Sequence, residues 1–233
     1  MGIKKITKGL ILSLLLSSGM VVAADFDKGL EAYSSGDYKA ALVEWTPLAE
    51  QGNAYAQSML GDMYQYGKGV PENDRTAAKW YTKAAEQGNA YAQADLGYMY
   101  TYGEGVPKND KTAVKWFTLA AEQGNADAQG MLGVMYKHGK GVPKNYLRAY
   151  MWYNLSSYNG NKRTSDVKVK FSKELTSADI IKAQDMSSRC LESDYADCGL
   201  TSFEGTSGCA YNNIEECSDE TVCHISVVTS NSG

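Results

Sequence analysis

The hexapeptide AEQGNA at residues 49–54 returns unchanged at residues 85–90 and 121–126. A worn fourth copy, YNGN, stands at residues 158–161. The glycines of the four copies lie at positions 52, 88, 124 and 160, so each step is 36 residues. A repeat of this period is typical of a stacked array of small units rather than of a globule with one core. The sequence therefore predicts a repeat protein, and such arrays present extended surfaces that bind other proteins.

The first half of each period carries a helical pattern. Its apolar residues are spaced by four, three and one residues, which places them on one helical face: Ala56, Leu60, Met63 and Tyr64. The same residue types recur 36 and 72 residues later. Gly61 lies within this helix and costs about 1 kcal/mol relative to Ala in an isolated helix. We therefore expect another helix to approach the Gly61 backbone closely.

The second half of each period contains a turn and another helix. Glycine at position 67 ends the first helix, Pro71 prevents the helix from continuing, and Asn73 is suited to cap the next one. Apolar residues then recur at intervals of three to four: Ala77, Trp80, Tyr81 and Ala84. One hairpin of this kind cannot bury its own apolar stripe, so neighbouring hairpins must stack into a continuous core. The pattern predicts an all-α solenoid of stacked helical hairpins.

The pattern divides the chain into five parts. They are a leader (1–24), an N-terminal capping hairpin (25–52), the repeats (53–160), a degraded repeat with a capping helix (161–198) and a cysteine-containing tail (199–233). The tail is rich in Gly, Ser, Thr and Asn, and is expected to be either irregular and held by its cysteines or disordered.

The degraded repeat is expected to contain a weak helix around Phe171. Thr176 then begins a last helix. Its predicted apolar face consists of Ile180, Ile181, Ala183, Gln184, Met186 and Leu191. We expect this helix to cover the open end of the array.

The first 24 residues are typical of a secretory signal peptide. Lysines at positions 4, 5 and 8 precede an apolar stretch at 9–22, and alanines follow at 23 and 24. The alternative is an uncleaved anchor, but this stretch is short for a membrane span, which needs about 20 residues. Cleavage removes three lysines and no acid, which lowers the formal net charge of −4 by three, to −7. We expect an exported, mildly acidic chain with no membrane insertion after cleavage and no affinity for nucleic acid.

All five cysteines lie beyond the repeats: Cys190, Cys198, Cys209, Cys217 and Cys223. In an oxidising compartment such a cluster indicates disulfide bonds. Cys190 and Cys198 are close in sequence and flank a predicted helix end, so they are the first expected pair. Two of the remaining three can then pair, which leaves one thiol over. No CxxC motif occurs and no metal site is expected.

The chain lacks a recognisable catalytic constellation. It has two histidines, His138 at a predicted helix end and His224 in the tail. Ser165 and Lys168 match the short Ser-x-x-Lys pattern, but the companion motifs of that chemistry are missing. We therefore predict that the protein is not an enzyme and uses no cofactor.

The repeated motif resembles the Sel-1-like repeat family, which is related to the tetratricopeptide repeats. It reads Ala-x-Ala-Gln-x-x-Leu-Gly-x-Met-Tyr-x-x-Gly-x-Gly-Val-Pro-x-Asn, followed by Ala-x-x-Trp-Tyr/Phe-x-x-Ala-Ala-Glu-Gln-Gly-Asn. The resemblance covers about residues 26–195 and implies a right-handed α-solenoid that binds other proteins. It also implies a periplasmic or secreted bacterial protein, with roles such as host interaction, envelope assembly or neutralisation of a toxin. Exported members with weak β-lactamase-like activity carry a cysteine pair in each repeat, which this chain lacks.

A binding face is expected on the first helix of each unit, which lines the concave surface in the related tetratricopeptide geometry. Positions beside the apolar stripe differ between copies while the stripe itself does not. The predicted contact residues are Tyr55, Met59, Asp62, Tyr66, Tyr91, Asp95, Tyr98, Tyr102, Asp127, Met131 and His138. Tyrosine suits such a surface because it is part apolar and part hydrogen-bonding, and the chain has 17 Tyr against four Phe. For the tyrosines the alternatives are packing between repeats or idle exposure, and for the acids simple solvation.

The sequence thus predicts an exported scaffold that binds another protein in its concave groove. Two alternatives stay open. One is a weak hydrolase acting on β-lactams or peptidoglycan, and the other is a purely structural envelope protein without a discrete partner.

Overall fold

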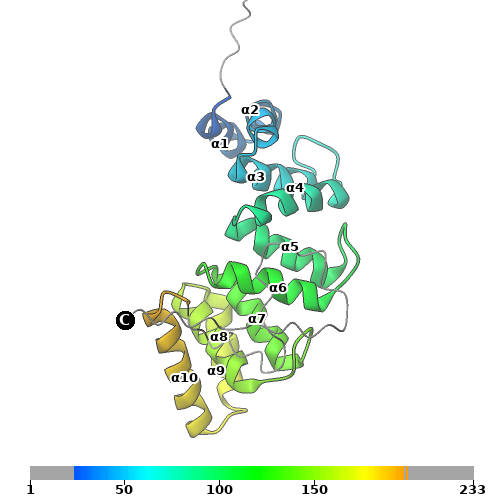
Figure 1. The fold of residues 1–233 in the computed structure, drawn as a ribbon. Coiled ribbons are helices and arrows are strands. Elements are labelled where there is room, and N and C mark those ends of the chain that lie inside the picture. The colour runs from blue at the N-terminus through cyan, green and yellow to red at the C-terminus, as the bar shows by residue number, and fades with distance from the viewer. Residues whose placement is uncertain (1–23, 197, 199–233) are drawn as a thin grey trace, which may run out of the picture.

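A computed structural model of the protein describes residues 24–196 and 198, and this part of the chain contains ten α-helices and no strand (Figure 1). The helices are α1 (Phe26–Ser35), α2 (Tyr38–Glu50), α3 (Ala54–Gln65), α4 (Asp74–Glu86), α5 (Ala90–Tyr102), α6 (Asp110–Ala121), α7 (Ala126–His138), α8 (Tyr146–Tyr158), α9 (Lys162–Ser172) and α10 (Ser177–Glu192). None of them is long and apolar enough to cross a lipid bilayer. The predicted leader, except for Ala24, and the tail from 199 lie outside the described residues.

Consecutive helices from α1 to α9 pack against one another in chain order, which confirms the predicted solenoid of stacked hairpins (Figure 1). Three clusters of buried side chains follow one another along the stack, and the largest lies at its C-terminal end. Tyr100 packs against both of the clusters in the middle and C-terminal parts. No hairpin therefore has a core of its own, as a stacked array requires.

Asparagine caps begin the helices of every repeat. The side chains of Asn53, Asn89 and Asn125 each accept a hydrogen bond of 2.9 Å from the backbone N–H three residues later. Asn73 does the same at the start of α4, at 3.0 Å. These bonds satisfy backbone donors that a helix end leaves free, so the repeated Asn fixes where each helix begins.

The mid-helix glycines accommodate aromatic rings of the second helix in the same unit. A Cβ atom added to Gly61 would lie 2.5 Å from the Tyr81 ring, and one added to Gly97 would lie 2.7 Å from the Phe117 ring. Gly133 has the same relation to Tyr153 in the third unit, at 2.5 Å. The expectation of a close approach is confirmed, and the approaching group is a side chain rather than a backbone.

The second glycine of the loop between the two helices of a unit packs against the backbone of the preceding unit. Gly105 has φ +64° and lies against the backbone of Asp74, at the start of α4 in the unit before. Gly141 has φ +70° and lies against the backbone of Asp110 in the same way. A side chain at either position would meet both a strained backbone and this neighbour.

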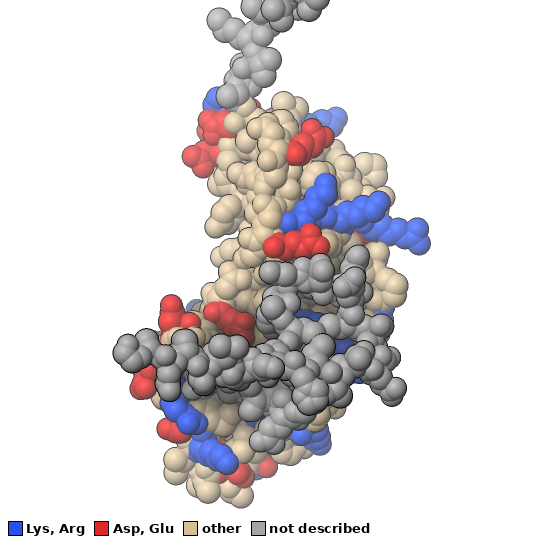
Figure 2. All heavy atoms as spheres, in the orientation of Figure 1, with Lys and Arg blue, Asp and Glu red and all other residues tan. Residues whose placement is uncertain are grey.

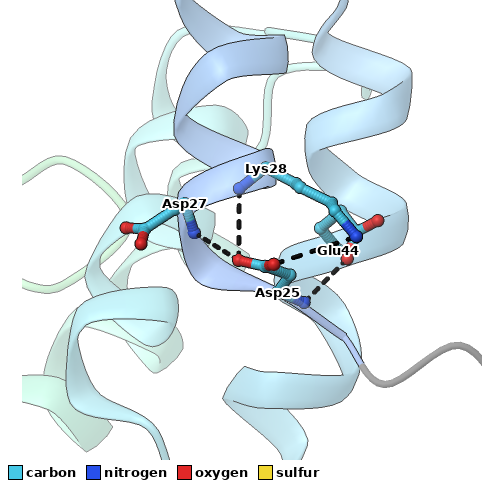
Figure 3. Close-up of polar contacts among 4 residues, drawn as sticks. All are labelled: Asp25, Asp27, Lys28 and Glu44. Carbon is cyan, nitrogen blue, oxygen red and sulfur yellow. Dashed lines mark hydrogen bonds and ion pairs between the residues drawn. The ribbon is translucent and has the colours of Figure 1, made fainter.

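The N-terminal hairpin is held together by polar contacts around Asp25 (Figure 3). The Asp25 carboxylate accepts hydrogen bonds from the backbone N–H groups of Asp27, at 3.0 Å, and Lys28, at 3.4 Å, and so caps α1. The Asp25 backbone N–H donates to the Glu44 carboxylate on α2 at 2.8 Å. The start of α1 is thereby tied to its partner helix α2.

At the other end of the array, α10 packs mainly on α8 and covers it, as predicted (Figure 1). The expected disulfide between Cys190 and Cys198 is present. The predicted apolar face of α10 was wrong in part, since Ile181 is 66% exposed and Gln184 is also exposed. The residues that α10 buries are Ala183, Ser187 and Cys190. They are small and recur every three or four residues, so α10 lies close on α8. The predicted Ile180, Met186 and Leu191 are partly buried and pack against the same core cluster, and only Ile181 among the predicted aliphatic residues is exposed.

Candidate protein-binding face

The eleven predicted contact residues fall on α3, α5 and α7 or at the C-terminal cap of α3. Successive first helices contact one another directly, α3 with α5 and α5 with α7, and contacts between α4 and α6 are fewer. The first helices therefore follow one another along one side of the stack. We call the surface of α3, α5 and α7 that lies opposite their buried residues the first-helix face.

Tyrosines dominate the exposed part of the first-helix face. The side chains of Tyr55, Tyr66, Tyr91 and Tyr102 are between 61% and 69% exposed. Residues on the opposite side of the same helices, such as Leu60 and Leu96, are 1% exposed. The repeats therefore hold a buried stripe constant and display large aromatic side chains beside it.

Tyr98 is a fixed part of this face rather than a free side chain. Its ring packs edge-on against Phe117, with centroids 5.1 Å apart, and lies parallel to the Tyr102 ring at 6.4 Å. Burial, with smaller contributions from Asp127, Tyr102 and Asp95, raises the pKa of Tyr98 to about 12. Tyr98 is therefore packed between the buried Phe117 ring and the exposed Tyr102 ring.

Three carboxylates cross the first-helix face, one on each helix. Asp62 lies on α3, Asp95 on α5 and Asp127 on α7. Asp95 follows Asp62 by 33 residues and Asp127 follows Asp95 by 32, against a repeat of 36. Each acid is therefore displaced by about one helical turn from the acid before it. We call this oblique row the carboxylate diagonal.

Asp95, at the centre of the carboxylate diagonal, has an altered acidity. Burial is the main cause, and the negative charges of Asp62 and Asp127 add to it, so the pKa of Asp95 is raised from 3.8 to about 7. Each of these effects disfavours the charged form. No hydrogen bond or ion pair joins the Asp95 carboxylate to another residue within 24–196.

Asp62, unlike Asp95, has a hydrogen-bond donor for its carboxylate. The Tyr81 hydroxyl donates to Asp62 Oδ1 at 2.6 Å and also lies 2.8 Å from Gln65 Oε1. Burial raises the pKa of Asp62, while the hydrogen bond from Tyr81 and the charge of Lys68 act in the opposite direction. The same Tyr81 ring fills the space left by Gly61, so one side chain links the core of the unit to the first-helix face.

The remaining predicted residues have mixed positions. Met59 and Met131 are partly buried and pack against the core clusters. Asp127 is exposed and accepts a hydrogen bond from the Asn161 amide at 2.8 Å. His138 is exposed and is the last residue of α7. Tyr55, Tyr91 and Asp127 occupy equivalent places in the first turn of their helices.

A polar pocket of about 360 Å³ opens beside the first turns of α5 and α7. It is lined by Ala90, Tyr91, Gln123, Gly124, Asn125, Ala126, Asp127 and Asn159. Two of the predicted contact residues, Tyr91 and Asp127, therefore belong to one hollow. The Tyr195 hydroxyl contacts one lining residue of this pocket, because it accepts a hydrogen bond from the Asn159 amide at 2.7 Å.

Sequence analysis missed a row of buried glutamines between the units. Gln93 is 3% exposed, donates to the Ala85 carbonyl at 3.0 Å and accepts from the Gln123 amide at 2.7 Å. Gln57 and Gln129 make the equivalent bonds in the other units. The signal was present, because Gln recurs every 36 residues directly after the repeated Ala-x-Ala.

The Ser-x-x-Lys pair is not assembled as a catalytic pair. The Ser165 hydroxyl is hydrogen-bonded with the Ser157 hydroxyl at 2.7 Å, and Lys168 donates to the Asn154 side chain at 3.0 Å. Within the described residues, no group of three or more His, Cys, Asp or Glu side chains is placed to hold a metal ion. His224 and the cysteines at 209, 217 and 223 lie outside that part of the chain.

Comparison with known proteins bears on these features. The Sel1 repeat model matches residues 54–89, 90–125 and 126–161, so each match begins at the first residue of α3, α5 or α7. Comparison with curated proteins gave no match. Among solved structures, the chain is similar to a Sel1 repeat protein from Oxalobacter formigenes, with 39% identity and a TM-score of 0.58 over 61% of this chain and 57% of that one.

The chain is also similar to c5321, a protective antigen present in uropathogenic Escherichia coli strains and displaying an SLR fold. The identity is 34% and the TM-score 0.60, over 76% of this chain and 39% of that one. The chain thus spans less than two thirds of the length of either relative. Three matched repeats, their shared boundaries with the helices and the stacked fold lead to one conclusion: residues 54–161 of this chain are three Sel1 repeats.

Proposed function

We propose that this protein is an exported scaffold that binds another protein on its first-helix face. Sel1 repeat proteins generally mediate protein–protein interaction and are generally not enzymes. The observation that carries the proposal for this chain is the set of four tyrosines, each more than 60% exposed, on α3, at its C-terminal cap and on α5. Large exposed aromatic side chains that recur on one face are typical of interaction surfaces.

Two observations support export. The leader pattern at residues 1–24 is that of a secretory signal peptide. The Cys190–Cys198 disulfide belongs to the described part of the chain, and disulfides persist mainly in oxidising compartments. Mass spectrometry of the protein isolated from its host, without reduction, tests this point. A mature N-terminus near residue 24 and an oxidised Cys190–Cys198 pair are expected, and an intact leader with free thiols would contradict export.

Capture experiments with matched variants test the binding face. The mature protein and a Tyr66→Ala/Tyr102→Ala variant are each used to recover partners from an envelope extract. Tyr158→Ala is the control, because Tyr158 is 72% exposed but lies at the end of α8, off the first-helix face. A partner recovered by wild type and control but lost by the double variant supports the proposal. Equal recovery by all three forms would contradict it.

A further inference from the structure

We propose that the acidic stretch at residues 215–220 of the tail binds the exposed basic side of α9 in the same molecule. This interaction lies at the C-terminal end of the array, so it goes beyond the proposed scaffold function of the first-helix face. An unpartnered helix, the charge of that helix and the point at which the tail leaves the array support it.

Helix α9 lacks the partner that the first helix of each repeat has. In the repeats, the first helix packs against the second helix of its own unit, α3 with α4, α5 with α6 and α7 with α8. Helix α9 follows as the next first helix and packs on α8, but α10 also packs on α8 rather than on α9. One side of α9 is therefore left without a helix in the described part of the chain.

The residues of α9 agree with this missing partner. Val169 follows Gly133 by 36 residues and so occupies the equivalent position. The Tyr153 ring covers Gly133, at 2.5 Å from an added Cβ, whereas Val169 is 60% exposed. Lys168 likewise replaces Leu132, which is fully buried in the last repeat. Val169 thus marks the side of α9 that no helix covers.

The uncovered side of α9 is basic. Its exposed cations are Lys162, Arg163, Lys170 and, at the C-terminal cap, Lys173. Because a helix turns about 100° per residue, these four side chains lie within about 100° of one another around the helix. Within the described residues, none of the four forms an ion pair or donates a side-chain hydrogen bond. We call these four residues the α9 basic face.

Nearby acids do not neutralise the α9 basic face. Glu174 is paired with Lys137 at 2.8 Å, and Asp185 on α10 is paired with Arg189 at 3.2 Å. Asp166 lies among the four cations and offsets one charge. Figure 2 shows Lys and Arg side chains at the C-terminal end of the stack and over α4. The α9 basic face is therefore complementary to an acidic segment.

The tail carries the complementary charge. Residues 199–233 contain five acids and no Lys or Arg, and four of the acids fall within EECSDE at residues 215–220. In extended form these six residues span about 17 Å, at about 3.3 Å per residue. Along a helix, the distance from residue 162 to residue 173 is also about 17 Å, at about 1.5 Å per residue. Four acids can thus lie along four cations over a similar length.

The tail leaves the array beside the start of α9. The disulfide to Cys190 holds Cys198 at the end of α10, and the Cys198 sulfur lies 3.3 Å from the Tyr195 carbonyl oxygen. The Tyr195 hydroxyl in turn accepts a hydrogen bond from Asn159 at 2.7 Å. Asn159 stands two residues before Asn161, which caps α9. Residue 198, from which the tail continues, is therefore anchored close to the α9 basic face.

The connection is long enough, and short enough, for binding within one molecule. Residue 215 follows residue 198 by 17 positions. A chain of this length has an r.m.s. end-to-end distance of about 21–25 Å, which is comparable to the length of α9. Tethering at such a distance gives an effective concentration in the millimolar range. The tail is thereby favoured over a separate acidic molecule as the occupant.

Carbodiimide crosslinking of the full mature protein tests the proposal, because the reagent joins a carboxylate to a lysine ammonium only when the two are in contact. Mass spectrometry should find links from residues 215–220 to Lys162, Lys170 or Lys173. The control lysines are Lys79 and Lys83, which are also exposed but lie on α4. The links to α9 should be lost in about 1 M salt, where the Debye length falls to about 3 Å.

A charge exchange assigns the contact to particular residues. Lys170→Glu/Lys173→Glu should lose the links at these two positions, and so should Glu215→Lys/Glu216→Lys. Combining the four substitutions should restore links between the same positions, because the charges are again opposite. The matched control, Lys79→Glu/Lys83→Glu, removes the same number of cations from α4 and should leave the links between the tail and α9 unchanged.

A mixture of isotopically labelled and unlabelled protein separates links within one molecule from links between two. Links that join two molecules, or tail links spread evenly over α4 and α9, would overturn the proposal. The absence of restored links in the charge-exchanged variant would also overturn it. So would binding of the wild-type protein to phosphatidylglycerol vesicles that Lys170→Glu/Lys173→Glu abolishes, since the α9 basic face would then be open to a membrane surface.

Discussion

The ring of Tyr81 lies directly over Gly61, where an added Cβ would stand 2.5 Å from the ring carbons. The relation recurs between Gly97 and Phe117 and between Gly133 and Tyr153. Each helix pair thereby approaches more closely than side chains would otherwise permit. This packing explains why glycine, which weakens a helix, recurs in the middle of α3, α5 and α7.

Substitution of this glycine should therefore destabilise the fold. Gly61→Ala forces the fully buried Tyr81 ring to move, which costs about 1–3 kcal/mol and outweighs the gain in helix propensity. Urea denaturation of single and double variants measures the effect. In a Tyr81→Ala background the clash is absent, so Gly61→Ala should stabilise by about 1 kcal/mol. The same destabilisation in both backgrounds would disprove the packing explanation.

Loss of a buried glutamine should weaken the contact between units. Gln93→Ala removes the donor to the Ala85 carbonyl and the acceptor of the Gln123 amide, at a cost of about 1–3 kcal/mol. Gln51→Ala is the control because the Gln51 side chain is exposed and makes no hydrogen bond within the described residues, and a smaller loss is expected. Chemical denaturation compares the two, and equal effects would show that the buried position of Gln93 does not matter.

Asp95 should make stability depend on pH. Its pKa is raised in the folded protein from 3.8 to about 7, so between these values the folded state binds more protons than the unfolded state. Stability therefore falls as pH rises from about 4 to about 7 through this group. Asp62, Asp127, Tyr66 and Tyr98 surround the carboxyl and do not change this sign.

Denaturation curves measured between pH 4.5 and 8 test this dependence. The contribution of Asp95 is the difference between wild type and Asp95→Asn. The variant should gain stability relative to wild type as pH rises towards 7. A difference that stays constant across the range would contradict the assigned environment of Asp95.

The Cys190–Cys198 disulfide should stabilise the C-terminal end of the array locally. It closes a loop of eight residues, and loops of this length correspond to about 2–3 kcal/mol. Cys190→Ser/Cys198→Ser should also release Tyr195 from Asn159 and expose the corner at Gly124. Hydrogen exchange should then accelerate in α10 while α3 to α6 remain unchanged. Acceleration throughout the array would show that the disulfide supports the whole stack instead.

The sequence alone was enough for the architecture because its signals are local and repeated. The 36-residue period, the Asn caps and the glycine at position 61 each have one physical use, and the structure shows that use. The cysteine pair at 190 and 198 was found for the same reason, since its two members are close in sequence.

Other features depend on how helices meet in space, which no local pattern specifies. Ile181 was placed on the buried face of α10 from its hydrophobicity, but α10 lies on α8 through small residues and leaves Ile181 exposed. The carboxylate diagonal joins Asp62, Asp95 and Asp127 from three units at positions that do not align with one another. Its existence follows only from the stacking of α3, α5 and α7.

Site-specific photocrosslinking tests the central claim, a partner on the first-helix face, most directly. A photoreactive phenylalanine analogue replaces Tyr66, Tyr102 or, as the control, Tyr158 in the protein expressed in its native host. The account predicts one shared adduct from positions 66 and 102 and none from position 158. An adduct from position 158 without any from 66 or 102 would place the partner elsewhere and contradict the account.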